Sequence, residues 1–333
     1  MVDGLVPGRA VSVDGAWGQP GLNLSHWPGN ATPPGLRHDL SVGIALEFAR
    51  LPARERGRLA EGCTAILANH YDTEGVCAVF AVRHPDLALP RAQALLDAGA
   101  AGDFFQVPGE DAFRLDAVVS NLDDPARSPW APRFAGLDDR ARHELLLHEL
   151  VDRLPGLLDG DLGEFRGLWE PELDRLRADL AALDRAARDE VVHLDLAVWT
   201  GREAGFVPGR HALFARTRAD RVLVIDTSGE GATFRLLLST LSWFDPVSRE
   251  ALPRPDLAAL AARLNEEEGC ADPDEAAWRA QATDSPAPQL WFGTARQPRY
   301  AEHNACLRPS RLAPALVQRC VADALRASWA FPG

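Results

Sequence analysis

The sequence predicts an α/β fold: a mainly parallel sheet with helices on both faces in residues 1–190, and a smaller α+β domain in residues 191–333. Three observations lead to this prediction. Short apolar runs alternate with helical patterns in the first part, as in parallel sheets with crossover helices. A leucine-rich helical stretch then spans residues 137–188. After Asp189 the pattern becomes strand-like, which separates the second domain from the first.

The first strands are predicted at Ala10–Val13 and Leu22–Ser25, because Gly and Pro bound two short apolar runs there. A helix over 42–50 follows, with Asp39 or Ser41 as its expected N-cap. Cys63–Ala68 is an almost continuous apolar run, as is typical of a central strand in a parallel sheet. We therefore expect this third strand in the middle of the sheet.

The remaining elements follow from the same patterns. Apolar residues at helical spacing predict helices over 76–83 and 90–101 in the first domain. In the second domain, strands are expected at 191–199, 212–216, 221–226 and 233–241, and helices at 255–268 and 311–328.

The charge composition excludes several classes of protein. The 333 residues include 35 basic and 48 acidic side chains, which gives a net charge of −13. An acidic chain lacks the basic surface that nucleic acids and anionic membranes attract, so we expect neither as a partner. All 35 basic residues are arginines, since the sequence has no lysine. This excludes Schiff-base and pyridoxal chemistry as well as enzymes that need a phosphate-loop or kinase lysine.

The location of the protein is predicted from what the sequence lacks. Residues 1–20 do not have the pattern of a signal peptide, and no apolar run approaches the ~18 residues of a membrane span. The five cysteines, at 63, 77, 270, 306 and 320, form no C-x-x-C pair. We expect a soluble, cytoplasmic protein with reduced thiols. The sequence does not specify its oligomeric state.

The strongest local motif is His70-x-Asp72-x-Glu74, where the third predicted strand gives way to a helix. Residues two apart in an extended segment project to the same side, so these three side chains can converge beyond the strand. The carboxyl ends of strands are where open α/β sheets bind ligands. One imidazole and two carboxylates suit Mn²⁺, Zn²⁺, Fe²⁺ or Mg²⁺. The alternative is that Asp72 caps the helix and His70 is an ordinary loop residue.

Other polar residues are expected near the same edge. Asp103 follows a run of small residues at a helix end, and it either completes a metal site or lies in a turn. His26 and Asn30 lie in a loop after the second strand, so we expect this loop at the same sheet edge, within ~10 Å of Asp72. Asp39 is either a helix cap or a site residue.

The second domain offers a candidate anion site. Residues 200–255 contain eight arginines against six acidic residues, although the whole chain is acidic. Arginine binds phosphates and carboxylates through two parallel hydrogen bonds, so this segment could hold an anionic substrate. The alternative is ordinary surface ion pairs. Arg249 and Arg254 are our candidates for substrate contact.

Several tracts resemble an uncharacterised bacterial family that is known only as a domain of unknown function. In the N-terminal part these are Leu24–Asn30, His70–Gly75 and Gly102–Phe104. Ser242–Arg249, Leu252–Arg254 and Asp256–Leu257 fit the same family. The resemblance covers most of the chain, but it implies no established activity.

More distantly, the strand–His-x-Asp-x-Glu-Gly–helix arrangement is similar to the first metal motif of the DHH phosphoesterases. The resemblance implies two Mn²⁺ or Mg²⁺ ions at the junction of an α/β domain and a smaller C-terminal domain, and hydrolysis of phosphoesters or phosphoanhydrides. It implies ligand roles for His70, Asp72, Glu74 and Asp103. The sequence departs from that family in having Glu at the second acidic position, no Asp-His-His triplet and no C-terminal glycine-rich motif.

These observations predict a metal-dependent hydrolase, a phosphoesterase that acts on a small anionic substrate. We expect Mn or Mg as the metal, with Zn as an option, and catalytic roles for Asp72, His70 and His26. Asn30, Asp39, Arg249 and Arg254 are expected to contact the substrate. The alternative is a DHH-like protein without catalytic activity that binds or senses an anionic ligand.

Overall fold

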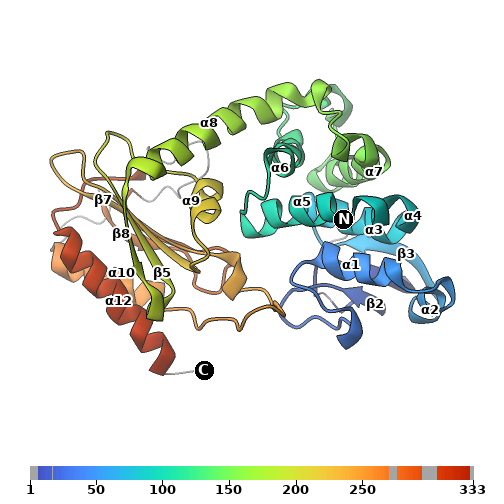
Figure 1. Cartoon of the computed structure of the whole chain (residues 1–333), viewed down its shortest axis with the longest axis horizontal. Helices are drawn as coiled ribbons and strands as arrows, with labels where there is room; N and C mark the ends of the chain where they lie inside the picture. The colour runs from blue at the N-terminus through green and yellow to red at the C-terminus, as the bar shows by residue number, and fades with distance from the viewer. Residues whose placement is uncertain (1–6, 17, 270–275, 295–305, 331–333) are drawn as a thin grey trace. The chain divides into compact units, whose positions relative to one another are not determined.

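A computed structural model describes residues 7–16, 18–269, 276–294 and 306–330. The chain forms two compact units, each described separately (Figure 1). Unit 1 comprises Met1–Arg175 and Phe244–Glu250, and unit 2 comprises Leu176–Trp243 and Ala251–Gly333. The change between them falls inside α8 (Arg166–Arg185). The predicted functional division at residue 190 stays a prediction.

Unit 1 contains a three-stranded parallel sheet in the order β2-β1-β3. Its strands are β1 (Arg9–Val13), β2 (Gly21–Leu24) and β3 (Cys63–Ala68). The central strand is therefore β1, which is buried along Ala10–Val13, and the prediction of a central β3 was wrong. The apolar sequence of β3 does not reveal this, because most of its residues lie partly or fully exposed at the sheet edge.

A glycine allows β1 and β2 to run side by side after a short connection. Gly21 has a φ of 134°, and a Cβ there would lie 2.0 Å from the carbonyl oxygen of Ala10. A larger residue would push the two strands apart, since backbone this close leaves no room for a side chain.

Helices surround this sheet. Those of unit 1 are α1 (Ser41–Arg50), α2 (Ala53–Leu59), α3 (Thr73–Arg83), α4 (Pro85–Ala88), α5 (Ala92–Phe104), α6 (Glu110–Leu122) and α7 (Asp139–Leu158). Short 3₁₀ turns occur at Pro34–Leu36, Leu89–Arg91, Ala131–Phe134 and Gly163–Phe165. Both α1 and α3 pack on the strands, and α5 packs on α3. The predicted polar cap of α1 was wrong: its N-cap is Leu40, with no side-chain hydrogen bond.

Unit 2 contains a six-stranded mixed sheet in the order β4-β5-β6-β7-β9-β8. The strands are β4 (Ala187–Val191), β5 (Leu196–Gly201), β6 (Arg221–Asp226), β7 (Thr233–Leu238), β8 (Ala277–Ala280) and β9 (Gln289–Gly293). Among these strands β5 and β6 pair in parallel, and the other pairs are antiparallel. The predicted α/β class holds, but "mainly parallel" describes the small sheet of unit 1 and not the larger sheet of unit 2.

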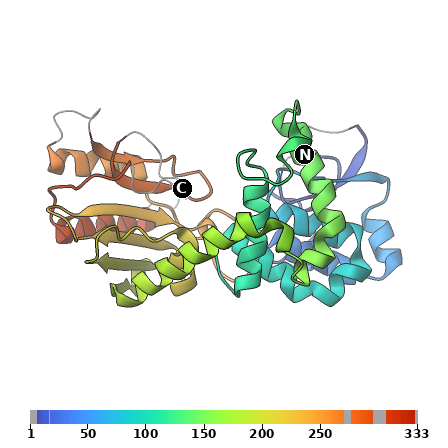
Figure 2. The ribbon, with the colours of Figure 1, turned by 90° about the horizontal axis from the view of Figure 1, so that it is seen from above.

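The core of unit 2 lies between this sheet and two helices (Figure 2). The helices are α10 (Leu257–Glu268) and α12 (Pro314–Ala330), which pack on each other and on the strands. The predicted strand at 212–216 was wrong, since Arg210–Arg216 form helix α9. A short apolar run has no strong periodicity, so local pattern does not separate the two states. The predicted strand 191–199 is broken at Asp195, whose φ is 48°.

The remaining features of the fold are two short turns, the free cysteines and the character of the helices. Short 3₁₀ turns occur at Val192–Leu194 and Thr240–Ser242. The thiols of Cys63, Cys77, Cys306 and Cys320 are free, and Cys270 lies outside the described residues. Across the described part of the chain, none of the helices combines the length and the apolar character needed to cross a membrane.

Candidate metal centre

Six ligand-type side chains gather at the carboxyl edge of the parallel sheet of unit 1. Asp14 follows β1, His26 follows β2, His70 and Asp72 follow β3, Glu74 lies in the first turn of α3, and Asp103 lies in the last turn of α5. They form two groups, and in each group one ligand atom per residue lies within 4.8 Å of the others. These residues meet at one sheet edge because three parallel strands end there, but the set expected from the motif is divided: His70 and Asp72 lie in one group and Glu74 in the other.

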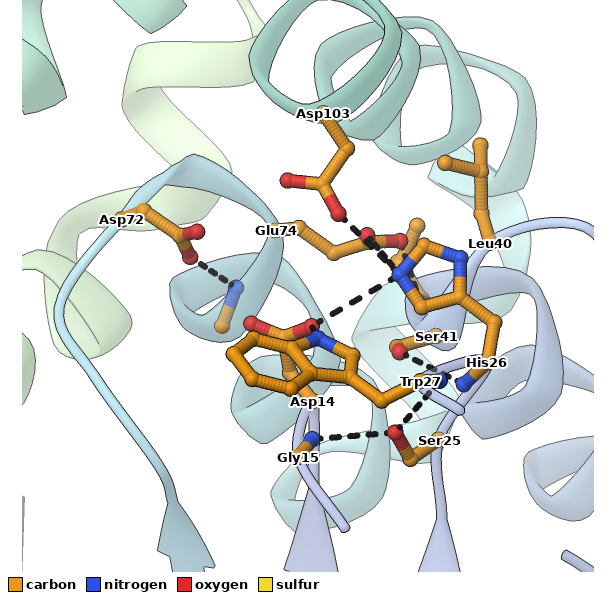
Figure 3. Close-up of polar contacts among 12 residues, drawn as sticks. Asp14, Gly15, Ser25, His26, Trp27, Leu40, Ser41, Asp72, Glu74 and Asp103 are labelled. Atoms are coloured by element: carbon orange, nitrogen blue, oxygen red, sulfur yellow. Dashed lines mark hydrogen bonds and ion pairs between the residues drawn. The ribbon is translucent and has the colours of Figure 1, made fainter. Parts of the chain in front are cut away.

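The inner group is Asp14, His26, Glu74 and Asp103, and it is almost completely buried (Figure 3). His26 Nε2 lies 3.1 Å from Asp103 Oδ2, 3.3 Å from Glu74 Oε2 and 3.9 Å from Asp14 Oδ1. One imidazole nitrogen thus faces three carboxylates from three different elements. Glu74 is held by the backbone N–H of Val42, which donates to its Oε1 over 3.0 Å.

The outer group is Asp14, His70 and Asp72. His70 Nε2 lies 2.5 Å from Asp72 Oδ2 and 3.6 Å from Asp14 Oδ2. The side chains of His70 and Asp72 are 37% and 29% exposed, so this group opens to solvent. Asp14 belongs to both groups, and its two carboxylate oxygens face the two histidines separately.

The orientation of His26 leaves its Nε2 directed at the carboxylates. Its Nδ1 lies 2.5 Å from the carbonyl oxygen of Asp39, which can only accept, so Nδ1 carries the proton. Its ring stacks on Phe244, with ring centroids 3.8 Å apart and planes inclined by 20°. A backbone carbonyl on one nitrogen and an aromatic ring on one face fix the imidazole as in metal-ligating histidines.

Asp14 is held in an unusual backbone conformation. Its φ is 50°, in the left-handed region that few residues other than glycine adopt. Such a conformation costs about 1–3 kcal/mol and is concentrated at functional sites. Trp27 Nε1 donates to Asp14 Oδ1 over 3.1 Å, and the next residue, Gly15, lies so close to Asn69 that a Cβ would clash with it. These contacts place the Asp14 carboxylate between the two histidines.

The electrostatics of the centre are unfavourable without a cation. Four carboxyls and two imidazoles meet here, so full ionisation gives −4 against at most +2. Burial, and then the negative charge of Asp72, raise the pKa of Asp14 to about 7. Burial and the Asp103 charge hold the pKa of Glu74 well above its usual range. Burial alone would lower the pKa of His70, but Asp72 and Asp14 outweigh it and raise that pKa to about 10.

The donor set fits a divalent cation. Asp14 Oδ2, His26 Nε2 and Glu74 Oε2 are buried and make no hydrogen bond of acceptable geometry within the described residues. Such atoms are costly to bury unless something binds them. A divalent ion would satisfy them and offset the like charges that raise these pKa values. Mixed imidazole and carboxylate ligands suit Mn²⁺, Mg²⁺ or Zn²⁺.

The charge of Asp14 predicts how the metal-free protein responds to pH. A carboxyl with a raised pKa binds more protons in the folded than in the unfolded chain, so folding stability falls as pH rises between the two values. For Asp14 this window runs from its ordinary 3.8 to about 7. As pH rises through this window, we expect the free energy of unfolding of chelator-treated wild type to fall more than that of Asp14→Asn. Thermal unfolding of both proteins at pH 4–8 measures this, and parallel curves would contradict it.

Asp72 caps α3 and also belongs to the outer group, so its place suits both of the roles that the sequence left open. Its Oδ1 accepts a 2.8 Å hydrogen bond from the backbone N–H of Gly75, so it caps α3. Its Oδ2 meanwhile faces His70 in the outer group (Figure 3 shows Asp72 with its cap bond). The cap therefore positions this carboxylate without using both of its oxygens.

The predicted substrate-contact residues lie outside the two ligand groups. Asn30 donates to the carbonyl of Trp27 over 2.8 Å. The Asp39 carboxylate accepts from the backbone N–H groups of Val247 and Ser248, each over 2.8 Å. Arg249 is half-buried in unit 1. Their roles in substrate binding stay predictions.

Arg254 has a structural task within unit 2. Its guanidinium donates to the carbonyl oxygens of Ser239, Thr283, Ser285 and Pro286 and to Ser242 Oγ. These bonds tie the segment before α10 to the loop before β9. Its predicted contact with substrate also stays a prediction.

The sequence-based reasoning missed Asp14. The sequence did contain an indication of Asp14, because this residue directly follows a predicted strand, as the His26 loop and His70 do. The same rule, a polar side chain at the carboxyl end of a parallel strand, would have found it. It also missed Phe244, whose contact with His26 joins residues far apart in the sequence.

Comparison with known proteins assigns the chain to a family but identifies no activity. A family model described as a family of unknown function (DUF6687) matches residues 4–332. No curated protein matches the chain. Among solved structures, the chain is similar to PggH, a pGpG-specific phosphodiesterase from Vibrio cholerae, at 10% sequence identity over 79% of this chain and 81% of that chain, with a TM-score of 0.36. A TM-score at this level does not establish a common fold.

Proposed function

The chain belongs to DUF6687, a family of unknown function, and we propose from its metal centre that it is a metal-dependent phosphoesterase acting on a small anionic substrate. The observation that carries the proposal is the pair of ligand groups that share the buried Asp14. Centres in which a carboxylate joins two neighbouring ion sites are common in enzymes that hydrolyse phosphate esters. The resemblance of the His70–Gly75 motif to the DHH phosphoesterases supports the same chemistry.

Each group would have a different task. Asp14, His26, Glu74 and Asp103 would hold an inner ion, away from solvent, and Asp14, His70 and Asp72 would hold an outer ion. Bound divalent ions would polarise a phosphoryl oxygen and acidify a water molecule. Mn²⁺ or Mg²⁺ fits the carboxylate-rich set best, and the imidazoles also allow Zn²⁺.

The residues of the outer group face the side from which substrate can arrive. His70 and Asp72 are partly exposed, whereas Asp14, His26 and Glu74 are buried completely. His26 has its Nδ1 proton committed to Asp39 O, so it acts as a fixed ligand. The catalytic role proposed for His70 and Asp72 is therefore to hold the outer ion, whose bound water would be acidified on the solvent side. Asn30, Asp39 and Arg249, all in unit 1, remain the proposed substrate contacts.

Metal content is the first test of this proposal. We expect one or two divalent ions per chain after growth in medium supplemented with Mn and Zn. Chelation should lower the melting temperature of unit 1 by about 5–10 °C, because an ion at 100 times its Kd contributes ~2.7 kcal/mol and 1 kcal/mol corresponds to ~2–4 °C for a unit of this size. Elemental analysis and thermal unfolding measure both quantities. Metal-free protein from supplemented medium would overturn the proposal.

Hydrolysis is the second test. With added Mn²⁺, the protein should cleave at least one of three generic substrates: a phosphodiester, a phosphomonoester or pyrophosphate. Asp72→Asn should keep the cap of α3, since the amide oxygen can still accept from Gly75, but lose at least ~100-fold of the activity. Metal binding without hydrolysis of any of the three would instead favour the ligand-binding protein without catalytic activity.

A further inference from the structure

The segment Phe244–Glu250, which we call the strap, belongs to unit 1, although the chain on both sides of it belongs to unit 2. The strap forms neither a helix nor a strand, and four of its seven residues are exposed. Its position in unit 1 depends on non-covalent contacts, because neither covalent neighbour lies in that unit. Exposed segments without regular structure open locally at a lower free energy than packed helices and strands do.

One side chain of the strap covers the inner ligand group. The ring of Phe244 stacks on the ring of His26, with centroids 3.8 Å apart. It also lies 6.0 Å from the ring of Phe104, which follows the ligand Asp103 in the sequence. The ring of Trp27, which follows His26, lies 6.4 Å away. The strap therefore packs its aromatic ring among residues that adjoin two of the four inner ligands.

Regular elements of the core enclose the other inner ligands. Glu74 lies in α3 and accepts from Val42 of α1. Asp103 lies in α5, and Asp14 directly follows β1. The side chains of the inner group are 0% exposed except for Asp103, at 9% (Figure 3). An ion therefore needs a transient opening to enter or leave, and the strap can open without separating a helix from the sheet.

Asp39 fastens the strap and fixes His26 at the same time. Its carboxylate accepts from the backbone N–H groups of Val247 and Ser248, each over 2.8 Å, and from Ser248 Oγ. Its backbone carbonyl lies 2.5 Å from His26 Nδ1. The backbone N–H of Asp245 in turn donates to the carbonyl of His26 over 2.8 Å. Release of the strap would thus free both a ring face and a backbone contact of this ligand.

We propose that the strap is the gate of the inner ion site: it detaches to let a divalent ion in or out, and closes when Ser248 binds Asp39. This inference rests on the metal centre of the proposed function, but not on hydrolysis. The closed strap holds His26 toward the carboxylates, so an ion binds the closed state more tightly and, by reciprocity, keeps the strap closed. Surface contacts of the strap then set the rate at which the inner ion exchanges.

Release of Mn²⁺ from the full chain tests the gate. The Asp72→Asn variant serves as the background, because it is expected to keep only the inner ion. Loss of Mn²⁺ to excess chelator is followed by electron paramagnetic resonance, at chelator concentrations that no longer affect the rate. Adding Ser248→Asp should speed release at least ~10-fold, because it places a second carboxylate against Asp39. If that variant misfolds, Ser248→Ala replaces it, with an expected acceleration of about threefold.

A compensating substitution and a control show whether the effect comes from the contact with Asp39. Adding Asp39→Asn to Ser248→Asp should slow release again, because the amide can donate to the introduced carboxylate. Asp124→Ala is the matched control, since Asp124 is an exposed carboxylate of unit 1 that accepts from the backbone N–H of Ala126 over 2.8 Å. It should leave the release rate within about twofold of the background.

Hydrogen exchange measures the strap directly. The amides of Asp245, Val247 and Ser248 should exchange at least ~10-fold more slowly with Mn²⁺ bound than without it. Bound Mn²⁺ with release rates that neither substitution at Ser248 changes would overturn the gate and leave the metal centre intact. Absence of bound Mn²⁺ from both wild type and Asp72→Asn would overturn the metal centre, and the gate with it.

Discussion

Replacing Asp14 by Asn should remove both metal ions and abolish hydrolysis. Asp14 is the residue that the two ligand groups share, and each of its oxygens faces a different histidine. Loss of its charge therefore weakens both sites, and we expect activity to fall by at least ~100-fold, beyond the ~10–100-fold typical of residues that only orient ligands. The fold should survive, because Asn tolerates the left-handed conformation of this position and its amide oxygen can still accept from Trp27.

The number of ions bound per chain distinguishes Asp14, which belongs to both ligand groups, from residues that belong to one group. In titration with excess Mn²⁺, wild type should fill both groups with two ions, Asp72→Asn should keep the inner one, and Asp14→Asn should keep neither. Asp116→Asn is the matched control, because Asp116 is a buried carboxyl of unit 1 that accepts from Thr73 and belongs to neither group. Elemental analysis and calorimetric titration with Mn²⁺ give these numbers. Two ions retained by Asp14→Asn would remove Asp14 from the centre.

Replacing Phe244 by Ala should lower the affinity of the inner site by about 10–100-fold, although Phe244 ligates nothing. Its ring covers one face of His26, and the backbone N–H of Asp245 donates to the carbonyl of His26 over 2.8 Å. Without the ring, the imidazole gains freedom to rotate away from Glu74 and Asp103. The substitution also opens a cavity, which costs about 3–5 kcal/mol of the free energy of unfolding.

A second phenylalanine distinguishes positioning from general loss of stability. Phe113 in α6 is buried to the same degree as Phe244, at 6% exposed each, and lies in the same unit. Phe113→Ala should lower the melting temperature but leave Mn²⁺ affinity within about twofold of wild type. Calorimetric titration well below both melting temperatures measures the affinity. Equal losses of affinity in the two variants would show that Phe244 acts through stability alone.

Much of the candidate site could be predicted because its signals are local. His70, Asp72 and Glu74 lie within five residues, next to an apolar strand, and a parallel sheet brings the ends of its strands to one edge. That rule also brought His26 to the site from a loop more than forty residues away. The two interpretations of Asp72 proved compatible, because a carboxylate has two oxygens, one for the cap and one for the site.

The sequence by itself determined the types of side chain available, the absence of lysine, and the strand ends at which ligands gather. Tertiary structure decided which strand is central, which arginines are tied to carbonyl groups, and which distant residues touch. An apolar run predicts a buried strand, but the edge strand β3 has the same kind of apolar sequence as a central strand. The contact between Phe244 and His26 joins segments 218 positions apart, and no local pattern encodes such a pair. Those contacts depend on chain topology, which is settled when the whole core packs.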